Sequence, residues 1–141
     1  MYCIKMNRDK SLTTTVRSTI YCGEKNADHL TFLLPTVCGE VDIEHSDVYL
    51  TYVLPDQEGK TTLKLEPSNT VKMGHVRFVI AITEELTRTP GQIRVWIDVV
   101  GADGNILLKS GDGSVYVSNA HRPMSDDSTD EPENSGGVIY F

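Results

Sequence analysis

The chain has 141 residues, of which 39% are hydrophobic and 23% charged, which is ordinary for a globular protein. This length suits a single domain that can bury a core without disulfides or metals. The net charge of −7 argues against nucleic acid and anionic membranes as partners, because binding phosphate requires clustered lysine and arginine. Five of the acids fall within residues 126–133: Asp126, Asp127, Asp130, Glu131 and Glu133.

The three cysteines, Cys3, Cys22 and Cys38, have no Cys-x-x-Cys spacing, so they predict neither a zinc site nor a disulfide framework. The first eight residues lack the apolar core of a signal peptide, and no run approaches the roughly 20 apolar residues of a membrane span. We therefore expect synthesis in a reducing cytoplasm with free thiols. A Cys3–Cys38 or Cys22–Cys38 bridge in a mature assembly is the alternative.

The first third of the chain predicts short strands separated by polar loops. Residues 2–7 alternate apolar and polar side chains, and residues 12–21 are rich in β-branched residues, which favour extended structure. Residues 23–28 form a polar loop, and the strand over 29–34 stops at Pro35. Residues 36–46 are mixed and predict a loop with a short edge strand.

The middle of the chain predicts a hairpin, a further strand and one helical turn. Residues 48–54 and 61–66 are strand-like, and Pro55 and Gly59 lie in the loop between them. Residues 67–69 are expected to close this unit. Residues 75–83 alternate again, and residues 84–87 suit one turn of helix.

The clearest signal is the stretch from Gly91 to residue 108. Ile93, Val95, Ile97 and Val99 alternate with other side chains, a period of two that is typical of a half-buried strand. Residues 103–105, Asp-Gly-Asn, tolerate positive φ and predict a hairpin turn before a strand over 106–109. A second turn is expected at residues 111–113, before a last strand over 115–117.

Short strands with turn signals between them, and no sustained helical periodicity, predict an all-β protein. We expect an immunoglobulin-like antiparallel β-sandwich of about 7–9 strands over residues 1–118. Residues 119–137 predict a flexible acidic linker, because they offer little to bury. The chain then ends on four apolar residues, Val138, Ile139, Tyr140 and Phe141, which suit either a docking segment or a strand that folds back onto an open sheet edge.

No arrangement of residues predicts catalysis, so we expect no enzyme, cofactor or metal. The four histidines (His29, His45, His75 and His121) lack the spacing of a metal site. The acids around His45 do not have the regular ligand spacing of a calcium loop. No Gly-x-Ser-x-Gly motif is present, and Gly111-Asp112-Gly113 precedes a strand, where a phosphate-binding loop would precede a helix.

Aromatic residues are the candidates for a binding surface. Tyr49 and Tyr52 fall on opposite faces of their strand, and Trp96 is out of phase with the apolar set of its own strand. Trp96 and Val100 are therefore predicted to face outward, where a tryptophan can fill a protein interface or stack on a sugar. The alternatives are burial of both faces of this strand, or a core that contains Trp96 and Val100 while the other face packs in an oligomer. The candidate interface residues are Trp96, Val100, Tyr49, Tyr52, Val138, Ile139, Tyr140 and Phe141.

Residues 4–118 resemble the N-terminal immunoglobulin-like domain of the upper baseplate proteins of tailed phages and prophages of Gram-positive bacteria. The resemblance lies in residues 23–32 and 48–52, and most clearly in residues 84–97, which run from Glu84-Glu85-Leu86-Thr87 through Pro90-Gly91 into the alternating strand. The hairpin at Asp103-Gly104 and the strand over 115–117 complete it.

This resemblance implies a structural virion protein of the tail or baseplate that performs no reaction. It implies assembly with other virion proteins, oligomerisation, and location in the virion after synthesis in the bacterial host cytoplasm. The chain has no long helical or fibre region after the domain, so a small adaptor that docks through its C-terminal tip fits best. The alternatives are a capsid-decorating or head-fibre protein, and a carbohydrate-binding module for surface glycans.

Overall fold

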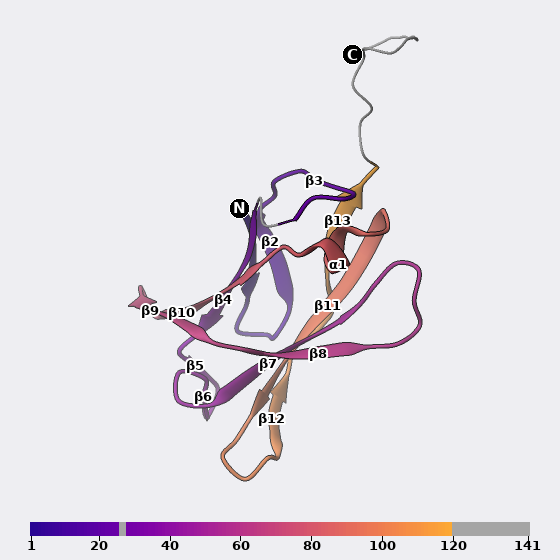
Figure 1. Ribbon diagram of the computed structural model, residues 1–141. Helices are drawn as coiled ribbons and strands as arrows, with labels where there is room; N and C mark the ends of the chain where they lie inside the picture. The colour runs from indigo at the N-terminus through magenta and orange to yellow at the C-terminus, as the bar shows by residue number, and fades with distance from the viewer. Residues whose placement is uncertain (26–27, 120–141) are drawn as a thin grey trace, which may run out of the picture.

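The computed structural model describes residues 1–25 and 28–119 and, for residues 69–72, the backbone alone (Figure 1). The described residues form thirteen strands and one short helix. The elements before the helix are β1 (Tyr2–Met6), β2 (Leu12–Val16), β3 (Ile20–Tyr21), β4 (His29–Pro35), β5 (Val37–Cys38), β6 (Val41–Asp42), β7 (Asp47–Val53), β8 (Thr61–Leu65), β9 (Pro67–Lys72) and β10 (His75–Ala81). The helix α1 (Glu84–Thr87) precedes β11 (Gly91–Val100), β12 (Ile106–Lys109) and β13 (Gly113–Ser118).

Two sheets form the sandwich. Sheet A has the order β2-β1-β4-β10-β9, and sheet B has the order β3-β13-β11-β7-β8, with β12 also paired to β11. Strands β5 and β6 pair only with each other, as a small separate hairpin. The structure confirms the predicted all-β sandwich, and its strands run from Tyr2 to Ser118. The thirteen strands exceed the predicted 7–9, and three of them, β3, β5 and β6, are only two residues long, too short for a period of two to reveal.

Most of the ladders are antiparallel, as predicted, but two are parallel. β1 lies parallel to β4, and β3 lies parallel to β13. The pair of β3 with β13 forms because the β-branched run over residues 12–21 is not one strand. Its first part, β2, belongs to sheet A, whereas its last two residues, β3, cross to sheet B.

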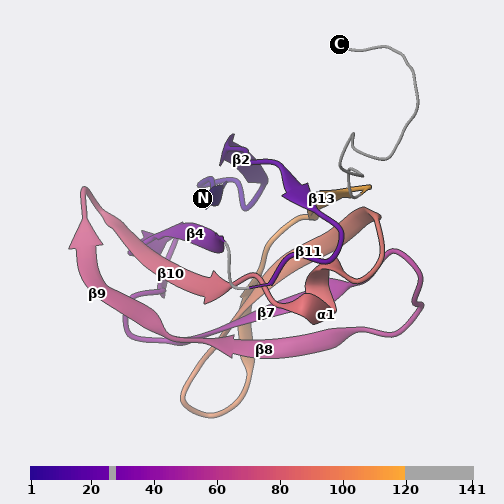
Figure 2. The same ribbon diagram turned by 45° about the horizontal axis from the view of Figure 1, so that its top comes forward.

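The two sheets are tied together along both sides of the sandwich. On one side β8 runs into β9 across Glu66, so one extended segment serves sheet B and then sheet A (Figure 2). On the other side the backbone N–H of Gly111 donates to the carbonyl of Lys10 at 2.8 Å. The Tyr2 hydroxyl also donates to the Ser114 carbonyl at 3.4 Å.

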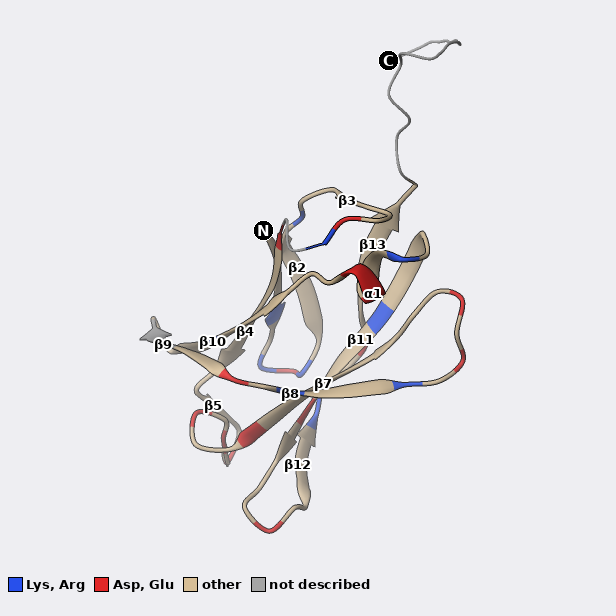
Figure 3. Cartoon of the chain, in the orientation of Figure 1, with Lys and Arg blue, Asp and Glu red and all other residues tan. Residues whose placement is uncertain are grey.

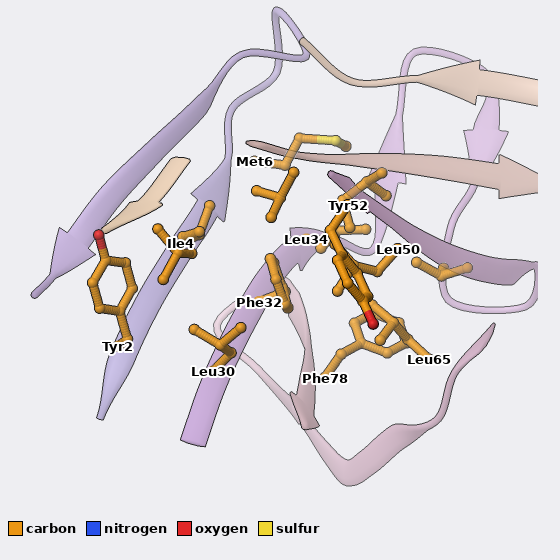
Figure 4. Close-up of a cluster of buried hydrophobic side chains, with 14 of the residues drawn as sticks. Tyr2, Ile4, Met6, Leu30, Phe32, Leu34, Leu50, Tyr52, Leu65 and Phe78 are labelled. Carbon is orange, nitrogen blue, oxygen red and sulfur yellow. The ribbon is translucent and has the colours of Figure 1, made fainter. Parts of the chain in front are cut away.

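Inward-facing side chains of both sheets fill the space between them. Figure 4 shows Phe32 and Leu34 of β4 near Leu50 and Tyr52 of β7 in this core. The predicted alternation along β11 is confirmed, because its alternate residues are all buried: Ile93, Val95, Ile97 and Val99. Burying an aliphatic or aromatic side chain of this size stabilises the fold by about 1.5–3 kcal/mol.

Several local predictions are confirmed. Pro35 is the last residue of β4, and residues 84–87 form the predicted helical turn. The mixed region 36–46 contains the small hairpin β5–β6, which pairs with neither sheet, in place of the predicted edge strand. The turn between β11 and β12 has Gly104 at a φ of 86°, and the Asp103 carboxylate accepts the backbone N–H of Asn105 at 3.1 Å. This is the turn chemistry that the Asp-Gly-Asn sequence indicated.

Two turn predictions are wrong. Residues 67–69 do not close a hairpin but begin β9, an edge strand in which Pro67 is the first residue and its missing N–H is tolerated. Residues 111–113 are not a hairpin turn, because β12 and β13 both pair with the same edge of β11. Between them the Ser110 hydroxyl accepts the Ile97 N–H at 2.8 Å and donates to the Gly111 carbonyl at 2.8 Å, which bridges the gap in the ladder.

Candidate interface on the outer face of sheet B

The outer face of sheet B carries the alternate residues of its longest strand, β11. Arg94, Trp96, Asp98 and Val100 lie out of phase with the buried set, and each is exposed or half-buried. The structure therefore places Trp96 and Val100 facing outward, as the period of two predicted. Val100 lies opposite Ile106 of β12, which is largely exposed.

Trp96 sits between two cationic side chains. It lies opposite Thr51 of β7, whose hydroxyl forms a 3.1 Å hydrogen bond with that of Thr62 of β8. The Lys60 ammonium lies 5.8 Å from the centre of the indole ring, and the Arg94 guanidinium carbon lies 5.7 Å from it. Each cation is close enough for a cation–π attraction of about 0.5–1 kcal/mol at an exposed site.

These residues line a shallow hollow of about 660 Å³, here called the Trp96 hollow. It is lined by residues of β7, β11 and β12 and of the neighbouring loops. Figure 3 shows Lys or Arg positions in blue on β11 and in the loop before β8. Three bases and two acids line it. The full set is Val53, Gln57, Glu58, Lys60, Arg94, Trp96, Lys109, Ser110 and Asp112.

The bases of the hollow are only weakly neutralised. The Arg94 guanidinium lies 3.3 Å from the Asp112 carboxylate, and the Lys109 ammonium lies 3.6 Å from that of Asp98. Within residues 1–25 and 28–119, no carboxylate lies within ion-pair distance of the Lys60 ammonium. Exposed ion pairs contribute about 0–1 kcal/mol each, so these bases remain available to an external anionic group.

The two candidate tyrosines lie in different environments. Tyr49 is half-buried and lies opposite Asp98 on the outer face. Tyr52 is only 3% exposed and packs in the core (Figure 4), which corrects its assignment as an interface residue. Burial is the main reason that the pKa of the Tyr52 hydroxyl is raised, and the nearby Glu85 carboxylate adds to it. The period of two placed the two tyrosines on opposite faces of β7, but it could not show which face points into the core.

The structure also reveals a corner that the sequence did not predict. The two-residue turn between β9 and β10 consists of Met73 and Gly74, with φ values of 54° and 79°. The Thr36 N–H donates to the Gly74 carbonyl at 2.9 Å, and the Thr36 carbonyl accepts the N–H of Ile43 at 2.9 Å. The peptide groups of Thr36 thus tie the turn to the β5–β6 hairpin.

We call this region the Met73 corner and define it by Val37, Glu40, Asp42, Glu44 and Met73. Met73 is 90% exposed and Val37 is 50% exposed, and the three acids are exposed as well. Asp42 forms a 2.8 Å contact with the His45 ring, which lowers the pKa of the Asp42 carboxyl and raises that of His45. The sequence signal for this turn is a Met-Gly pair between two β-prone runs, and such a pair indicates a hairpin turn more weakly than Asn-Gly does.

Among the described residues, no three His, Cys, Asp or Glu side chains are placed to hold a metal ion. The three cysteines are free thiols, and the Cys22 thiol lies 3.1 Å from the Arg88 carbonyl. In the same described ranges, no helix is long and apolar enough to span a membrane. Of the predicted interface residues, Val138, Ile139, Tyr140 and Phe141 lie outside the part of the chain that the structure describes.

No protein-family model matches this chain, and no curated protein matches it. Among solved structures, the N-terminal domain of phage TP901-1 ORF48 is similar to it, with a TM-score of 0.52. The alignment covers 83% of this chain and 97% of that domain at 10% sequence identity. At this identity the similarity shows a shared fold, and the matching domain comes from a phage, as the resemblance drawn from the sequence predicted.

Proposed function

We propose that this chain is a structural protein of a bacteriophage particle, in the tail or baseplate, that assembles with other virion proteins. The observation that carries the proposal is the fold similarity to a phage domain over nearly the whole of that domain. The sequence resemblance to upper baseplate domains points the same way. Function does not follow from fold alone, so the location of the protein is what must be tested.

The surface supports an assembly role in preference to a chemical one. The Trp96 hollow offers an aromatic side chain and several weakly paired bases, and tryptophan and arginine are enriched at protein interfaces. The Met73 corner presents apolar side chains to solvent. A protein that works by contact needs such surfaces and does not require a buried cluster of reactive groups.

Purified particles of the phage that encodes this chain provide the test. Mass spectrometry of particles purified through two density gradients should detect the chain at a fixed ratio to known tail proteins. Antibody labelling in electron microscopy should then locate it at the tail end. Labelling on the head would indicate a capsid-decorating or head-fibre protein instead, and absence from the particles would contradict both.

A carbohydrate-binding module is the second candidate, and one observation favours it. Trp96 is half-buried in an open hollow that offers both hydrogen-bond donors and acceptors, and aromatic rings in such hollows can stack on sugars. The positions of Lys60 and Arg94 at the ring weigh against it, because a sugar would have to displace them. Glycan-array binding that is lost in Trp96→Ala and kept in Tyr116→Ala would support this candidate, since Tyr116 is exposed outside the hollow.

A further inference from the structure

We propose that copies of this chain associate head to tail, with the Met73 corner of one copy inserted in the Trp96 hollow of the next. The two surfaces lie on different parts of the sandwich. The corner is at the turn between β9 and β10, whereas the hollow is on the outer face of β7 and β11 (Figure 1). Two such different surfaces on one molecule define a heterologous contact, in which each copy can bind two neighbours.

The turn at Met73 has two features that are typical of a binding surface, an unfavourable backbone conformation and an exposed apolar side chain. A two-residue hairpin loop with positive φ at both positions favours Asn-Gly, because asparagine adopts the left-handed conformation more readily than a long apolar residue does. Here the first position is Met73, at a φ of 54°. The chain therefore tolerates an unfavourable backbone conformation and leaves a large apolar side chain in water, and both costs are offset if a partner covers it.

The Trp96 hollow has the chemistry to receive this side chain. Its volume of about 660 Å³ exceeds that of one methionine and admits flanking residues as well. Methionine sulfur makes favourable contacts with aromatic rings, and its flexible side chain adapts to an irregular surface. Insertion beside Trp96 and Val53 would remove apolar area of both copies from water.

The charges around the two surfaces are complementary. Glu40 and Glu44 of the corner are exposed, and neither forms an ion pair with another described residue. Lys60 of the hollow is likewise without an ion-pair partner in the described ranges, and bases outnumber acids there by three to two. We infer that the occupant of the hollow is a second copy of this chain, because each copy carries both the acidic, apolar corner and the basic, aromatic hollow.

The test uses two full-length variants that each disable one surface. Met73→Asn removes the apolar knob and relieves the backbone, so this variant should fold at least as well as the wild type. Lys60→Glu reverses an exposed charge in the hollow and leaves Trp96 in place. Sedimentation velocity should show concentration-dependent association of the wild type, and each variant should weaken it at least tenfold.

Mixing the two variants gives the decisive measurement. The intact hollow of Met73→Asn can accept the intact corner of Lys60→Glu, so an equimolar mixture should form one-to-one heterodimers and no larger species. Trp96 is the only tryptophan of the chain, so its emission should shift to shorter wavelength on mixing. Ile106→Asn, at the exposed start of β12, and Lys25→Glu, on the loop after β3, are controls that should associate like the wild type.

Three results would overturn the proposal. A wild type that stays monomeric at millimolar concentration has no such contact. Variants that associate as strongly as the wild type place the interface elsewhere. Variants that are both monomeric but do not pair when mixed indicate a contact between identical surfaces. Because the measurements use purified protein alone, their failure is distinguishable from absence of the chain from phage particles.

Discussion

The hydroxyl of Thr87, in helix α1, donates a hydrogen bond to the backbone carbonyl of Glu24, 63 residues earlier in the chain. The Thr87 carbonyl in turn accepts the N–H of Gly23 at 2.9 Å. Thr87 is completely buried, whereas Glu24 is half-buried and Gly23 is exposed. Helix α1 therefore fixes the loop after β3 at the end of the sandwich where β11 begins.

We predict that Thr87→Val destabilises the fold by about 0.5–1.5 kcal/mol, because the Glu24 carbonyl loses its hydroxyl donor while the shape of the side chain is kept. Urea denaturation followed by circular dichroism measures this change in the free energy of unfolding. Thr87→Ser keeps the hydroxyl and is the matched control. A valine variant as stable as the serine variant would show that this bond contributes nothing.

Gly91 is predicted to be intolerant of any side chain. Its φ is 131°, and a Cβ atom added there would lie 2.9 Å from the Cβ of Pro55. Gly91→Ala should therefore lower the free energy of unfolding by about 1–3 kcal/mol through backbone strain and the clash. Gly59→Ala is the control, because nothing lies within 4 Å of its Cβ position and that variant should unfold within about 0.5 kcal/mol of the wild type.

One buried and one exposed isoleucine of the β11–β12 region allow a test of the core. Ile97 is completely buried, whereas Ile106 is 52% exposed. Ile97→Ala should cost about 2–5 kcal/mol, since it removes buried methyl groups and leaves a cavity. Ile106→Ala should change stability by no more than about 0.5 kcal/mol. Thermal and urea denaturation measure both changes in stability. A larger loss in Ile106→Ala than in Ile97→Ala would contradict the assigned inward face of β11.

Acid stability should depend on Asp28. Its carboxylate lies 2.6 Å from the amino group of Met1 and accepts the Ser18 hydroxyl at 2.6 Å, and these contacts lower its pKa to about 2. Because the pKa in the folded state is below the ordinary value of 3.8, this stabilisation is present in full above about pH 4. It is lost as the pH falls through 2.

Asp28→Asn should thus be less stable than the wild type at pH 6, and the difference should shrink on acidification toward pH 2. Melting temperatures of both proteins between pH 2 and pH 7 provide the measurement. Asp56→Asn, on the exposed β7–β8 loop, is the control and should run parallel to the wild type over this range. A constant gap between Asp28→Asn and the wild type would exclude the charge of Asp28 as the cause.

The sequence predicted well what depends on neighbouring residues. The alternation around Trp96 was sufficient to place it on the outer face, and Asp103-Gly104 was sufficient for the hairpin turn. Prediction from the sequence failed where the place of a segment in a sheet depends on a partner that is distant in the chain. Pro67 looked like the end of a hairpin because nothing local shows that β9 occupies a sheet edge.

The candidate site was predicted only in part for the same reason. Arg94 precedes Trp96 by two residues, so strand geometry alone places both on one face. Lys60 reaches the same ring from the loop before β8, and only the pairing of β7 with β8 and β11 brings it there. The Met73 corner depends on the Thr36 peptide groups, which no pattern of side chains reveals.

The place of β13 in sheet B also constrains how the protein is made. This strand, the last of those described, lies between β3 and β11, so Ile20 pairs with Val117, which is synthesised almost a hundred residues later. Until Val117 has left the ribosome, β3 has no partner strand and the first half of β11 exposes an unpaired edge. Nascent chains that stall before this point should therefore be the aggregation-prone species, because open strand edges pair with other chains.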